Sequence, residues 1–347
     1  MQASIIIPVF NEVKFLENCV NSFMKDLKDR DNIEVLIIDG ESTDNTGKVI
    51  KELTKKYKQV RSYQNKNRIQ ASALNIGINE SSGEYLIRLD AHSEYSSEYI
   101  KRCIEILEKS SENIANVGGS ITTKPGSDTS VAKAISFILS EKLGVGNSAF
   151  RTEEILEEKL VETVPFGCFR RSALEEVGLF DENLVRGEDL ELNRRLINSG
   201  RKILISPLIK SVYYSRPDLL SFIKQAFVNG FYVLFSSKPS KKGLSRKAFH
   251  QLRHYLPLFF IFYLFIASIV LITNYSNSLT TIEIVFLSLL LVYLCIGVFL
   301  GIRLSFKEKG LIYLILTPLV LTILHTSYGL GSLLGLVSNL FRNRKEV

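Results

Sequence analysis

The segment ASIIIPVFNEVKFLENCVNSFMKDL, residues 3–27, joins two hydrophobic patterns that together indicate the fold. Residues 3–10 form a nearly continuous apolar run, which is typical of a strand that is buried on both faces. After Asn11, apolar residues recur at helical spacing, at Val13, Leu16, Val20, Phe23, Met24 and Leu27. The sequence therefore predicts a buried strand followed by a helix, and Asn11 is a suitable N-cap for that helix.

This order of strand and helix is repeated further along the chain. Apolar runs and helical patterns alternate in the order 33–40 (strand), 42–57 (helix), 60–65 (strand), 69–82 (helix) and 84–91 (strand). We expect Ser42, Thr43 or Asp44 to open the first of these helices. Alternation of units of this length, with strands apolar on both faces, predicts a parallel, doubly wound α/β sheet.

The composition divides the chain of 347 residues into a globular part and an apolar part. The hydrophobic share is 46%, and the excess follows Tyr255, whereas residues 1–254 mix polar and apolar types. We expect a globular domain at 1–235, a basic linker at 236–254 and a membrane region at 255–341. Because the first residues offer no basic segment before a short apolar run, we expect no signal peptide and a cytoplasmic globular domain.

The net charge of +7 is concentrated beside the predicted membrane region. Residues 236–254 contain six Lys or Arg and no acidic residue, which favours anionic lipid at a cytoplasmic face over nucleic acid, although a solvated linker fits as well. The four cysteines, Cys19, Cys103, Cys168 and Cys295, form no CxxC pair, which argues against a disulfide framework or a zinc site.

Three apolar segments make up the predicted membrane region. Segments 255–273 and 282–302 are each long enough to cross a bilayer as a helix. The loop between them lacks Lys and Arg and the next loop has three, so the positive-inside rule places the second loop and the globular domain in the cytoplasm. Segment 311–341 contains Pro318 and several glycines, so we expect three crossings, with a broken or re-entrant third helix as the alternative. Gly331-x-x-x-Gly335 within it has the spacing of a close-packing helix face.

Polar side chains follow the predicted strands where each strand ends, at residues 8–12, Asp39, Arg68 and residues 90–92. In parallel α/β sheets, ligands bind in the crevice at these carboxyl ends. The sequence has no GxGxxG after the first strand and no GxxxxGK[ST], so we expect neither a dinucleotide site nor a P-loop.

Four segments in this order resemble family 2 (GT-A fold) glycosyltransferases, and the resemblance covers about residues 3–235. They are IIIPVFNE (5–12), EVLIIDGESTDNT (34–46), IRLDAH (87–92) and VRGEDLELNRRL (185–196). The Asp-Ala-His variant, PFGCFRRSALEEVGLFDE (165–182) and the apolar tail are similar to the succinoglycan-type exopolysaccharide branch. The resemblance implies a GT-A doubly wound mixed sheet, followed by an α-helical membrane tail.

The resemblance also implies which residues hold the nucleotide-sugar donor. The positions that match the family's donor contacts are Pro8, Asn11, Glu12, Asp39, Arg68 and Asp90. A carboxylate at Asp39 can accept imino or hydroxyl protons, and an arginine at position 68 suits phosphate. Helix capping by Asp39 and a solvated loop arginine are the alternatives.

Asp90 and His92 are the candidate ligands of a divalent cation, Mn²⁺ or Mg²⁺. They lie two residues apart at a strand end and can converge on one side. Both cations prefer oxygen ligands, and Mn²⁺ tolerates imidazole. Most relatives have Asp-x-Asp here, so a histidine that takes no part in metal binding is the alternative reading of His92.

Glu188 and Asp189 open a predicted helix in VRGEDLELNRRL. The resemblance makes Asp189 the catalytic base, with Glu188 beside it, and one base without an enzymic nucleophile implies a single inverting displacement. Two acids that favour a helix N-terminus are the alternative. Gly167, Cys168 and Arg195 match the family's acceptor region.

The chain departs from the processive synthases of the family, because it has no Trp and therefore no Gln-x-x-Arg-Trp motif. The apolar segment 219–235 is expected to be an interfacial helix that seats the site at the membrane. We therefore expect a polyprenyl-diphosphate-linked saccharide as acceptor and membrane lipids as partners. A polyprenyl-phosphate sugar synthase and a non-catalytic nucleotide-binding scaffold are the alternatives.

Overall fold

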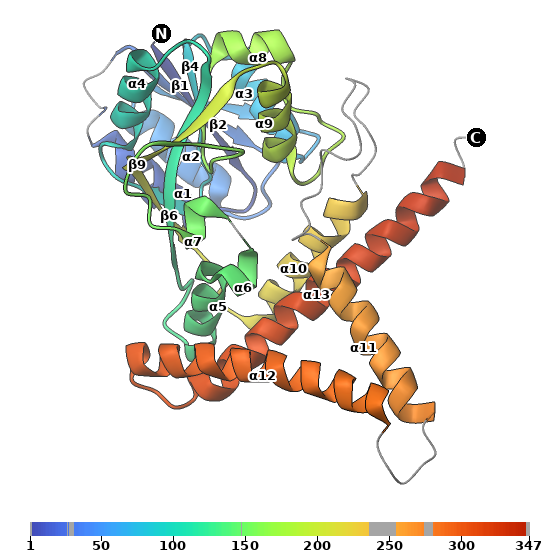
Figure 1. The fold of residues 1–347 in the computed structure, drawn as a ribbon. Helices are drawn as coiled ribbons and strands as arrows, with labels where there is room; N and C mark the ends of the chain where they lie inside the picture. Colours follow the sequence, from blue (N-terminus) through green and yellow to red (C-terminus); the bar gives the residue numbers. More distant parts are fainter. Residues whose placement is uncertain are drawn as a thin grey trace. The chain divides into compact units, whose positions relative to one another are not determined.

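The computed structural model describes residues 2–25, 27, 31–146, 148–235, 255–273 and 280–344 (Figure 1). The chain forms two compact units: Met1–Thr122 with Ser148–Tyr214, and Thr123–Asn147 with Ser215–Val347. The predicted globular domain, 1–235, is therefore divided between both units. The predicted basic linker, 236–254, lies outside the described residues.

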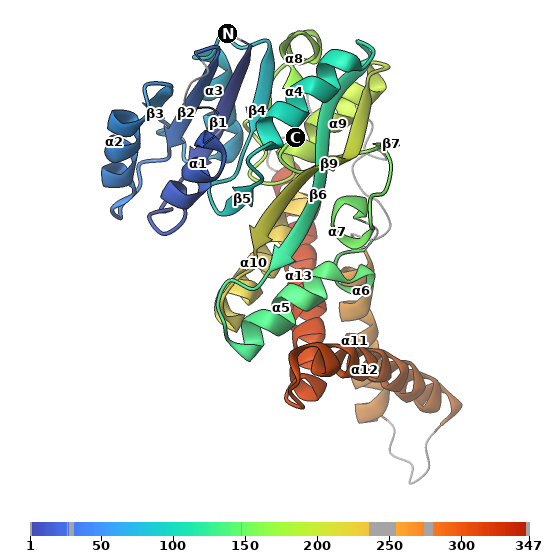
Figure 2. The ribbon, with the colours of Figure 1, turned by 90° about the vertical axis from the view of Figure 1, so that its left-hand side faces the viewer.

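A mixed β-sheet is the centre of the first unit (Figure 2). Its described strands are β1 (Ala3–Val9), β2 (Ile33–Asp39), β3 (Val60–Gln64), β4 (Tyr85–Arg88), β5 (Ser93–Tyr95), β6 (Ile114–Lys124), β7 (Lys159–Val161), β8 (Cys168–Arg170) and β9 (Lys202–Tyr214). They lie in the order β3-β2-β1-β4-β8-β6-β9-β5, and β7 pairs with β9. The first four strands are parallel and β8 joins β4 antiparallel, so the predicted parallel order and the mixed GT-A sheet are both confirmed.

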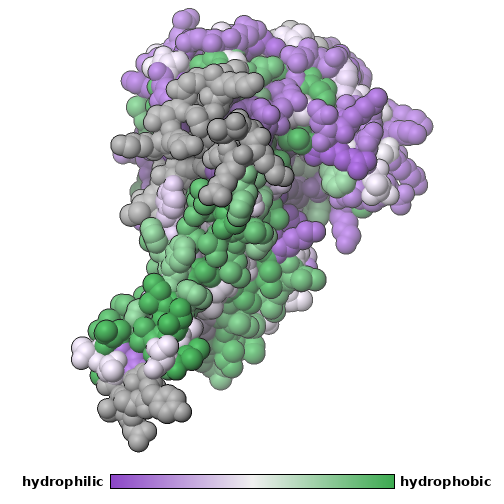
Figure 3. All heavy atoms as spheres, turned by 90° about the vertical axis from the view of Figure 1, so that its right-hand side faces the viewer, coloured by the Kyte–Doolittle hydropathy of each residue, from purple (hydrophilic) through white to green (hydrophobic). Residues whose placement is uncertain are grey.

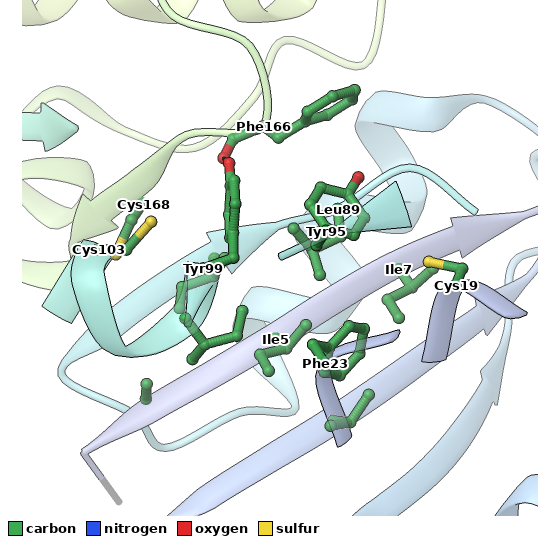
Figure 4. Close-up of a cluster of buried hydrophobic side chains, with 14 of the residues drawn as sticks. Ile5, Ile7, Cys19, Phe23, Leu89, Tyr95, Tyr99, Cys103, Phe166 and Cys168 are labelled. Atoms are coloured by element: carbon green, nitrogen blue, oxygen red, sulfur yellow. Dashed lines mark hydrogen bonds between the residues drawn. The ribbon is translucent and has the colours of Figure 1, made fainter. Parts of the chain in front are cut away.

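Helices cover both faces of this sheet. The described helices of the first unit are α1 (Leu16–Met24), α2 (Thr46–Lys56), α3 (Gln70–Asn79), α4 (Tyr99–Lys109), α7 (Ala149–Thr152), α8 (Arg171–Val177) and α9 (Glu188–Asn198). Because side chains alternate along a strand, Ile5 and Ile7 pack with α1 and α4 (Figure 4), whereas Ile6 packs with α3, α8 and α9. The continuous apolar run of β1 therefore reflects burial on both faces.

The structure corrects the predicted start of the first helix. α1 begins at Leu16, and its N-cap residue, Phe15, makes no side-chain cap. Asn11 lies well before the helix, in the left-handed backbone region with φ 58°. Its side chain instead accepts hydrogen bonds from the loop after β2, so it connects two loops and does not cap α1.

The second unit is helical. Its described helices are α5 (Ser130–Ser140), α6 (Lys142–Val145), α10 (Leu219–Phe235), α11 (Leu256–Thr273), α12 (Thr281–Glu308) and α13 (Tyr313–Arg344). α11, α12 and the Tyr313–Phe341 part of α13 are long and apolar enough to cross a membrane. Figure 3 shows the surface of these helices as almost entirely hydrophobic. α13 is one helix through Pro318, so the alternative of a broken third helix is not what the structure contains.

Glycines allow α10 and α13 to approach closely. A Cβ atom at Gly331 would lie 2.0 Å from the carbonyl oxygen of Phe227, and one at Gly335 would lie 2.2 Å from that of Phe231. On α10, a Cβ atom at Gly230 would lie 2.0 Å from the carbonyl oxygen of Tyr328. The predicted packing face at Gly331 and Gly335 is confirmed, because only glycine fits at this separation.

An insertion after β6 also belongs to the second unit, which the sequence patterns did not indicate. Ile135 and Ile138 of α5 pack in one hydrophobic cluster with Leu300 and Leu304 of α12. Ion pairs flank this cluster, from Lys133 Nζ to Glu308 Oε2 at 3.4 Å and from Arg303 Nη1 to Glu141 Oε2 at 3.0 Å. The sheet-forming sequence thus contributes two helices, α5 and α6, to the second unit.

Candidate active site

The loops after β1 and β2 are held together at the carboxyl edge of the sheet. The backbone N–H of Asn11 donates to Ser42 Oγ at 2.9 Å, and Asn11 Oδ1 accepts from the backbone N–H of Thr43 at 2.8 Å. Asp39 Oδ1 accepts from the hydroxyl of Ser42 at 2.6 Å and from its backbone N–H at 3.1 Å. Asn11 and Asp39 follow different strands and were both predicted to contact the nucleotide sugar. Both form hydrogen bonds with the same loop, at Ser42 and Thr43.

Three loops at this edge each carry a non-glycine residue in the left-handed backbone region. They are Asn11 (φ 58°), Glu41 (φ 57°) and Arg68 (φ 56°), which follow β1, β2 and β3. This conformation costs roughly 1–2 kcal/mol for a residue with a Cβ atom, and such strain is concentrated at functional sites. Arg68 Nη2 lies 2.8 Å from Glu41 Oε2, and both side chains are about half exposed. The predicted diphosphate arginine is thus at the rim of this edge, paired with an acid.

Arg88, at the end of β4, lies close to three acids that belong to separate sequence motifs. Its guanidinium lies 3.4 Å from Asp90 Oδ1, 3.4 Å from Glu188 Oε1 and 3.6 Å from Asp189 Oδ2. The Arg88 side chain is only 11% exposed, and its buried Nε has no acceptor among the described residues. One cation therefore faces three carboxylates across the β4 end and the α9 start.

Sequence reasoning missed Arg88, although a signal was present. The residue is a charged side chain within the apolar run EYLIRLDA, two positions before Asp90. Residues two apart on a strand lie on the same face, and a buried charge requires a partner. An arginine in such a run therefore indicates a nearby acid.

Asp90 is fixed by its backbone and by one carboxylate oxygen. Its N–H donates to the hydroxyl of Tyr95 at 2.8 Å. Oδ1 accepts from Gln70 Nε2 at 3.2 Å and from Arg88 Nη2 at 3.4 Å. Within the described residues, every recorded contact of this carboxylate involves Oδ1, which leaves Oδ2 as the oxygen for a ligand.

His92 contacts the other predicted donor residue at this edge, Glu12. Its Nδ1 lies 3.0 Å from Glu12 Oε1, and the backbone N–H of Glu12 donates to Thr46 Oγ1 at 2.8 Å. No group of three or more His, Cys, Asp or Glu within the described ranges is arranged to hold a metal ion. The chemistry of these side chains nevertheless suits a divalent cation, because carboxylate oxygens are preferred ligands of Mn²⁺ and Mg²⁺ and Mn²⁺ also accepts imidazole nitrogen.

Glu188 and Asp189 lie side by side at the start of α9 but differ in accessibility. Glu188 is 5% exposed, and its pKa is raised to about 7 by burial and by the Asp189 charge, although Arg88 opposes the increase. The Asp189 side chain is 40% exposed, and its Oδ1 accepts from the N–H of Leu190 at 2.8 Å. Asp189 is therefore the acid of the pair that a bound substrate can reach.

The remaining predicted residues are placed differently. Pro8 lies in β1 opposite Ile38, and the carbonyl of Gly167 accepts from the backbone N–H of Arg88 at 3.1 Å, so both border this edge. Cys168 is fully buried beside Cys103, as Figure 4 shows, so its thiol packs in the core.

Arg195, also predicted for the acceptor region, is 6% exposed, and its guanidinium forms hydrogen bonds with other groups of the protein. Its guanidinium pairs with Glu191 and donates to three backbone carbonyls, those of Val177, Gly178 and Leu179. Arg195 thus fastens the end of α8 to α9, and the structure gives it no contact with the acids around Arg88.

Comparisons with known proteins identify the family of this chain. Residues 4–178 match Glycosyl transferase family 2. The chain is 31% identical, over 96% of its length and 97% of the relative's, to the dolichyl N-acetyl-alpha-D-glucosaminyl phosphate 3-beta-D-2,3-diacetamido-2,3-dideoxy-beta-D-glucuronosyltransferase of Methanococcus voltae. It is 30% identical, over 73% of its length and 74% of the relative's, to the succinoglycan biosynthesis protein ExoA of Rhizobium meliloti.

A solved structure supports the fold. The mannosyltransferase PcManGT from Pyrobaculum calidifontis, in complex with GDP-Man and Mn²⁺, is similar with a TM-score of 0.63 and 15% identity. The similarity covers 98% of this chain and 87% of that one. With the GT-A sheet and the family match in agreement, the chain belongs to glycosyl transferase family 2 and is a glycosyltransferase.

Proposed function

We propose that this enzyme transfers one sugar, with inversion, from a nucleotide-diphosphate donor to a lipid-linked saccharide at a membrane surface. The observation that carries the proposal is the single guanidinium of Arg88 between Asp90 on one side and Asp189 on the other. Sugar transfer requires a site for the leaving diphosphate next to a base for the attacking hydroxyl. The Arg88 cluster, which consists of Arg88, Asp90, Glu188 and Asp189, supplies an acid for each task, and all three acids lie within 3.6 Å of the Arg88 guanidinium.

The donor occupies the carboxyl edge of the sheet in this proposal, with a UDP-sugar favoured. Asp39, Asn11 and Pro8 surround the nucleoside, and Arg68 contacts phosphate. Asp90, with His92 or Glu12, would hold a divalent cation, which would supply positive charge to the leaving diphosphate. The Mn²⁺ and GDP-Man in the Pyrobaculum calidifontis structure support a cation and a nucleotide sugar for this fold.

Asp189 is the proposed base. It is exposed enough to accept a proton from an acceptor hydroxyl, whereas buried Glu188 is not. Arg88 lies 3.6 Å from Asp189 Oδ2 and also pairs with Asp90, so its charge links the proposed base to the proposed diphosphate site. Without a second nucleophile from the protein, the hydroxyl attacks the anomeric carbon directly and the configuration inverts.

A lipid-linked acceptor is supported by the relatives and by the apolar unit. The name of the Methanococcus voltae relative describes a dolichyl N-acetylglucosaminyl phosphate as acceptor, and that of the Rhizobium meliloti relative describes succinoglycan biosynthesis. We therefore favour a polyprenyl-linked saccharide, joined through a diphosphate or a single phosphate, over a bare lipid phosphate. Gly167 lies at the border where this acceptor would enter.

The proposed location is a cell membrane, with α11, α12 and α13 crossing it and the first unit in the cytoplasm. The hydropathy of these helices supports crossing, and Arg303, Lys307 and Lys309 near the end of α12 support a cytoplasmic position for that end. Phe- and Leu-rich α10 packs on α13, which supports a place for it beside the membrane.

Purified membranes that contain the chain test this proposal directly. Radiolabelled UDP- and GDP-sugars are supplied with Mn²⁺ or Mg²⁺, or with EDTA, and lipid-linked product is extracted. We expect EDTA to abolish transfer and Asp189→Asn to lower kcat by about 10²–10⁴-fold. Full activity of Asp189→Asn refutes the base assignment, and transfer that resists EDTA refutes the cation. Absence of product with every donor favours a non-catalytic scaffold.

A further inference from the structure

Arg151, on α7, is a partly buried guanidinium outside the Arg88 cluster. Its guanidinium carbon lies 4.7 Å from the centre of the Tyr213 ring and 5.9 Å from that of Phe150. In the described part of the chain, no carboxylate or carbonyl oxygen accepts a hydrogen bond from it. Among the described residues, the N–H donors of this side chain therefore have no oxygen acceptor and can serve a ligand.

Arg151 lies beside the proposed diphosphate site. The Tyr213 ring, on β9, meets the His92 ring edge-on at 5.9 Å, and His92 in turn contacts Glu12. The ladder between β5 and β9 fixes this placement, because Ser93, the neighbour of His92, pairs with Tyr213. Arg151, Tyr213, His92 and Glu12 thus form a continuous series of contacts at the carboxyl edge of the sheet.

A cation in this position is costly without an anion. Burial lowers the pKa of Arg151, since a desolvated charge is disfavoured. The ring faces of Tyr213 and Phe150 offset only part of this cost. The acid two residues later, Glu153, pairs with Lys159 at 2.5 Å and does not serve Arg151. A bound anion would complete the charge.

We propose that Arg151 binds a phosphate group of a substrate, beside Asp90 and His92. The planar guanidinium fork matches two phosphate oxygens, and the Tyr213 ring lies against this guanidinium. The inference rests on the proposed function, because that function brings phosphate to this edge. Two sources carry this chemistry: the diphosphate of the nucleotide donor, and the phosphate that links the lipid to the saccharide.

Binding titrations of the full chain in detergent separate these sources. The donor probes are UDP, GDP and inorganic pyrophosphate with Mn²⁺, and the acceptor probe is farnesyl phosphate. The variants are Arg151→Gln and Arg151→Lys. The matched control is Arg102→Gln, because Arg102 is already paired with Glu98 and Glu105 on α4 and carries the same charge.

We expect Arg151→Gln to weaken binding of one class of probe about 10- to 100-fold, and Arg151→Lys to restore part of it because lysine keeps the charge without the fork. Loss confined to the donor probes assigns the donor diphosphate, and loss confined to farnesyl phosphate assigns the lipid link. Arg102→Gln should bind like the wild type.

Unchanged binding of every probe by Arg151→Gln overturns the inference, as does a wild-type chain that binds none of them. A lowered melting temperature with unchanged binding indicates a structural role and also overturns it. If Arg151→Gln fails to fold, Arg151→Lys decides by the same titrations. Arg151-dependent binding in a chain that transfers no sugar refutes the proposed function and leaves this site intact, so the two failures are distinguishable.

Discussion

Replacement of Glu188 by glutamine should stabilise the protein at alkaline pH. The buried carboxyl faces Arg88 from β4, Asp189 from its own helix and the charge of Asp90 at the end of β4. Burial is the largest influence, and it raises the pKa of Glu188 from the ordinary value of 4.5 to about 7. Glutamine has nearly the same shape as protonated glutamic acid but cannot ionise. The variant therefore isolates the cost of a buried negative charge.

The pKa of Glu188 sets both the sign and the size of the effect. Between pH 4.5 and 7 the folded chain holds a proton that the unfolded chain has released, so stability from this group is full below pH 4.5 and is lost as pH rises through 7. Each pKa unit corresponds to about 1.4 kcal/mol, which makes the loss about 3 kcal/mol at pH 8. Glu188→Gln does not lose this stability, because glutamine does not ionise. In a domain of this size, the melting temperature of the variant should be roughly 5–10 °C above that of the wild type at pH 8. At pH 4.5 the two melting temperatures should be equal.

Thermal unfolding of the detergent-solubilised chain, measured from pH 4.5 to 8.5 in EDTA without donor, tests this expectation. Glu52→Gln, at an exposed position of α2, is the matched control and should follow the wild type at every pH. Equal melting temperatures for Glu188→Gln and the wild type at pH 8, or a difference that is largest at pH 4.5, refute the reasoning. Either outcome means that Arg88 compensates the ionised carboxylate fully.

Three further predictions concern other parts of the molecule. Arg88→Met removes the cation shared by three acids and should destabilise the chain by about 3 kcal/mol at pH 8 and by less at pH 5, where Glu188 is protonated; a loss independent of pH contradicts this. His92→Ala should raise the Mn²⁺ concentration needed for half-maximal transfer, and an unchanged metal dependence makes His92 a bystander. Gly331→Ala should lower the free energy of unfolding by about 1–3 kcal/mol, because its Cβ atom would meet the backbone of α10. Gly47→Ala, with open space around it, should be neutral or stabilising, and equal effects of the two substitutions on thermal unfolding refute the packing argument.

Local patterns in the sequence were sufficient for the fold class, for the elements up to residue 91 and for the three membrane-length helices. The apolar run at 3–10 predicts β1 because a strand buried on both faces needs apolar residues at every position. The three membrane-length helices follow from segment length and hydropathy in the same way. Asp39 and Asp90 could be placed at one edge, since parallel strands carry their carboxyl ends to the same side.

Contacts between distant segments were beyond those patterns. Asparagine is a common N-cap residue, yet the Asn11 side chain accepts a hydrogen bond from the loop after β2. This contact forms because β1 and β2 are neighbouring strands. Cys168 and Arg195 lie in motifs that suggest an acceptor site, but packing turns the thiol into the core and the guanidinium toward Glu191.

The sequence by itself determined the alternating strands and helices up to residue 91, the three apolar membrane-length segments, and the sheet edge at which Asp39 and Asp90 lie. Only the tertiary structure decided that Arg88 joins Asp90 to Glu188 and Asp189. It also decided that Arg151 and His92 contact the same Tyr213 ring, with no acid paired to Arg151 among the described residues. The physical reason is that periodicity records which face of an element is buried, whereas charge pairing depends on which elements that burial brings together.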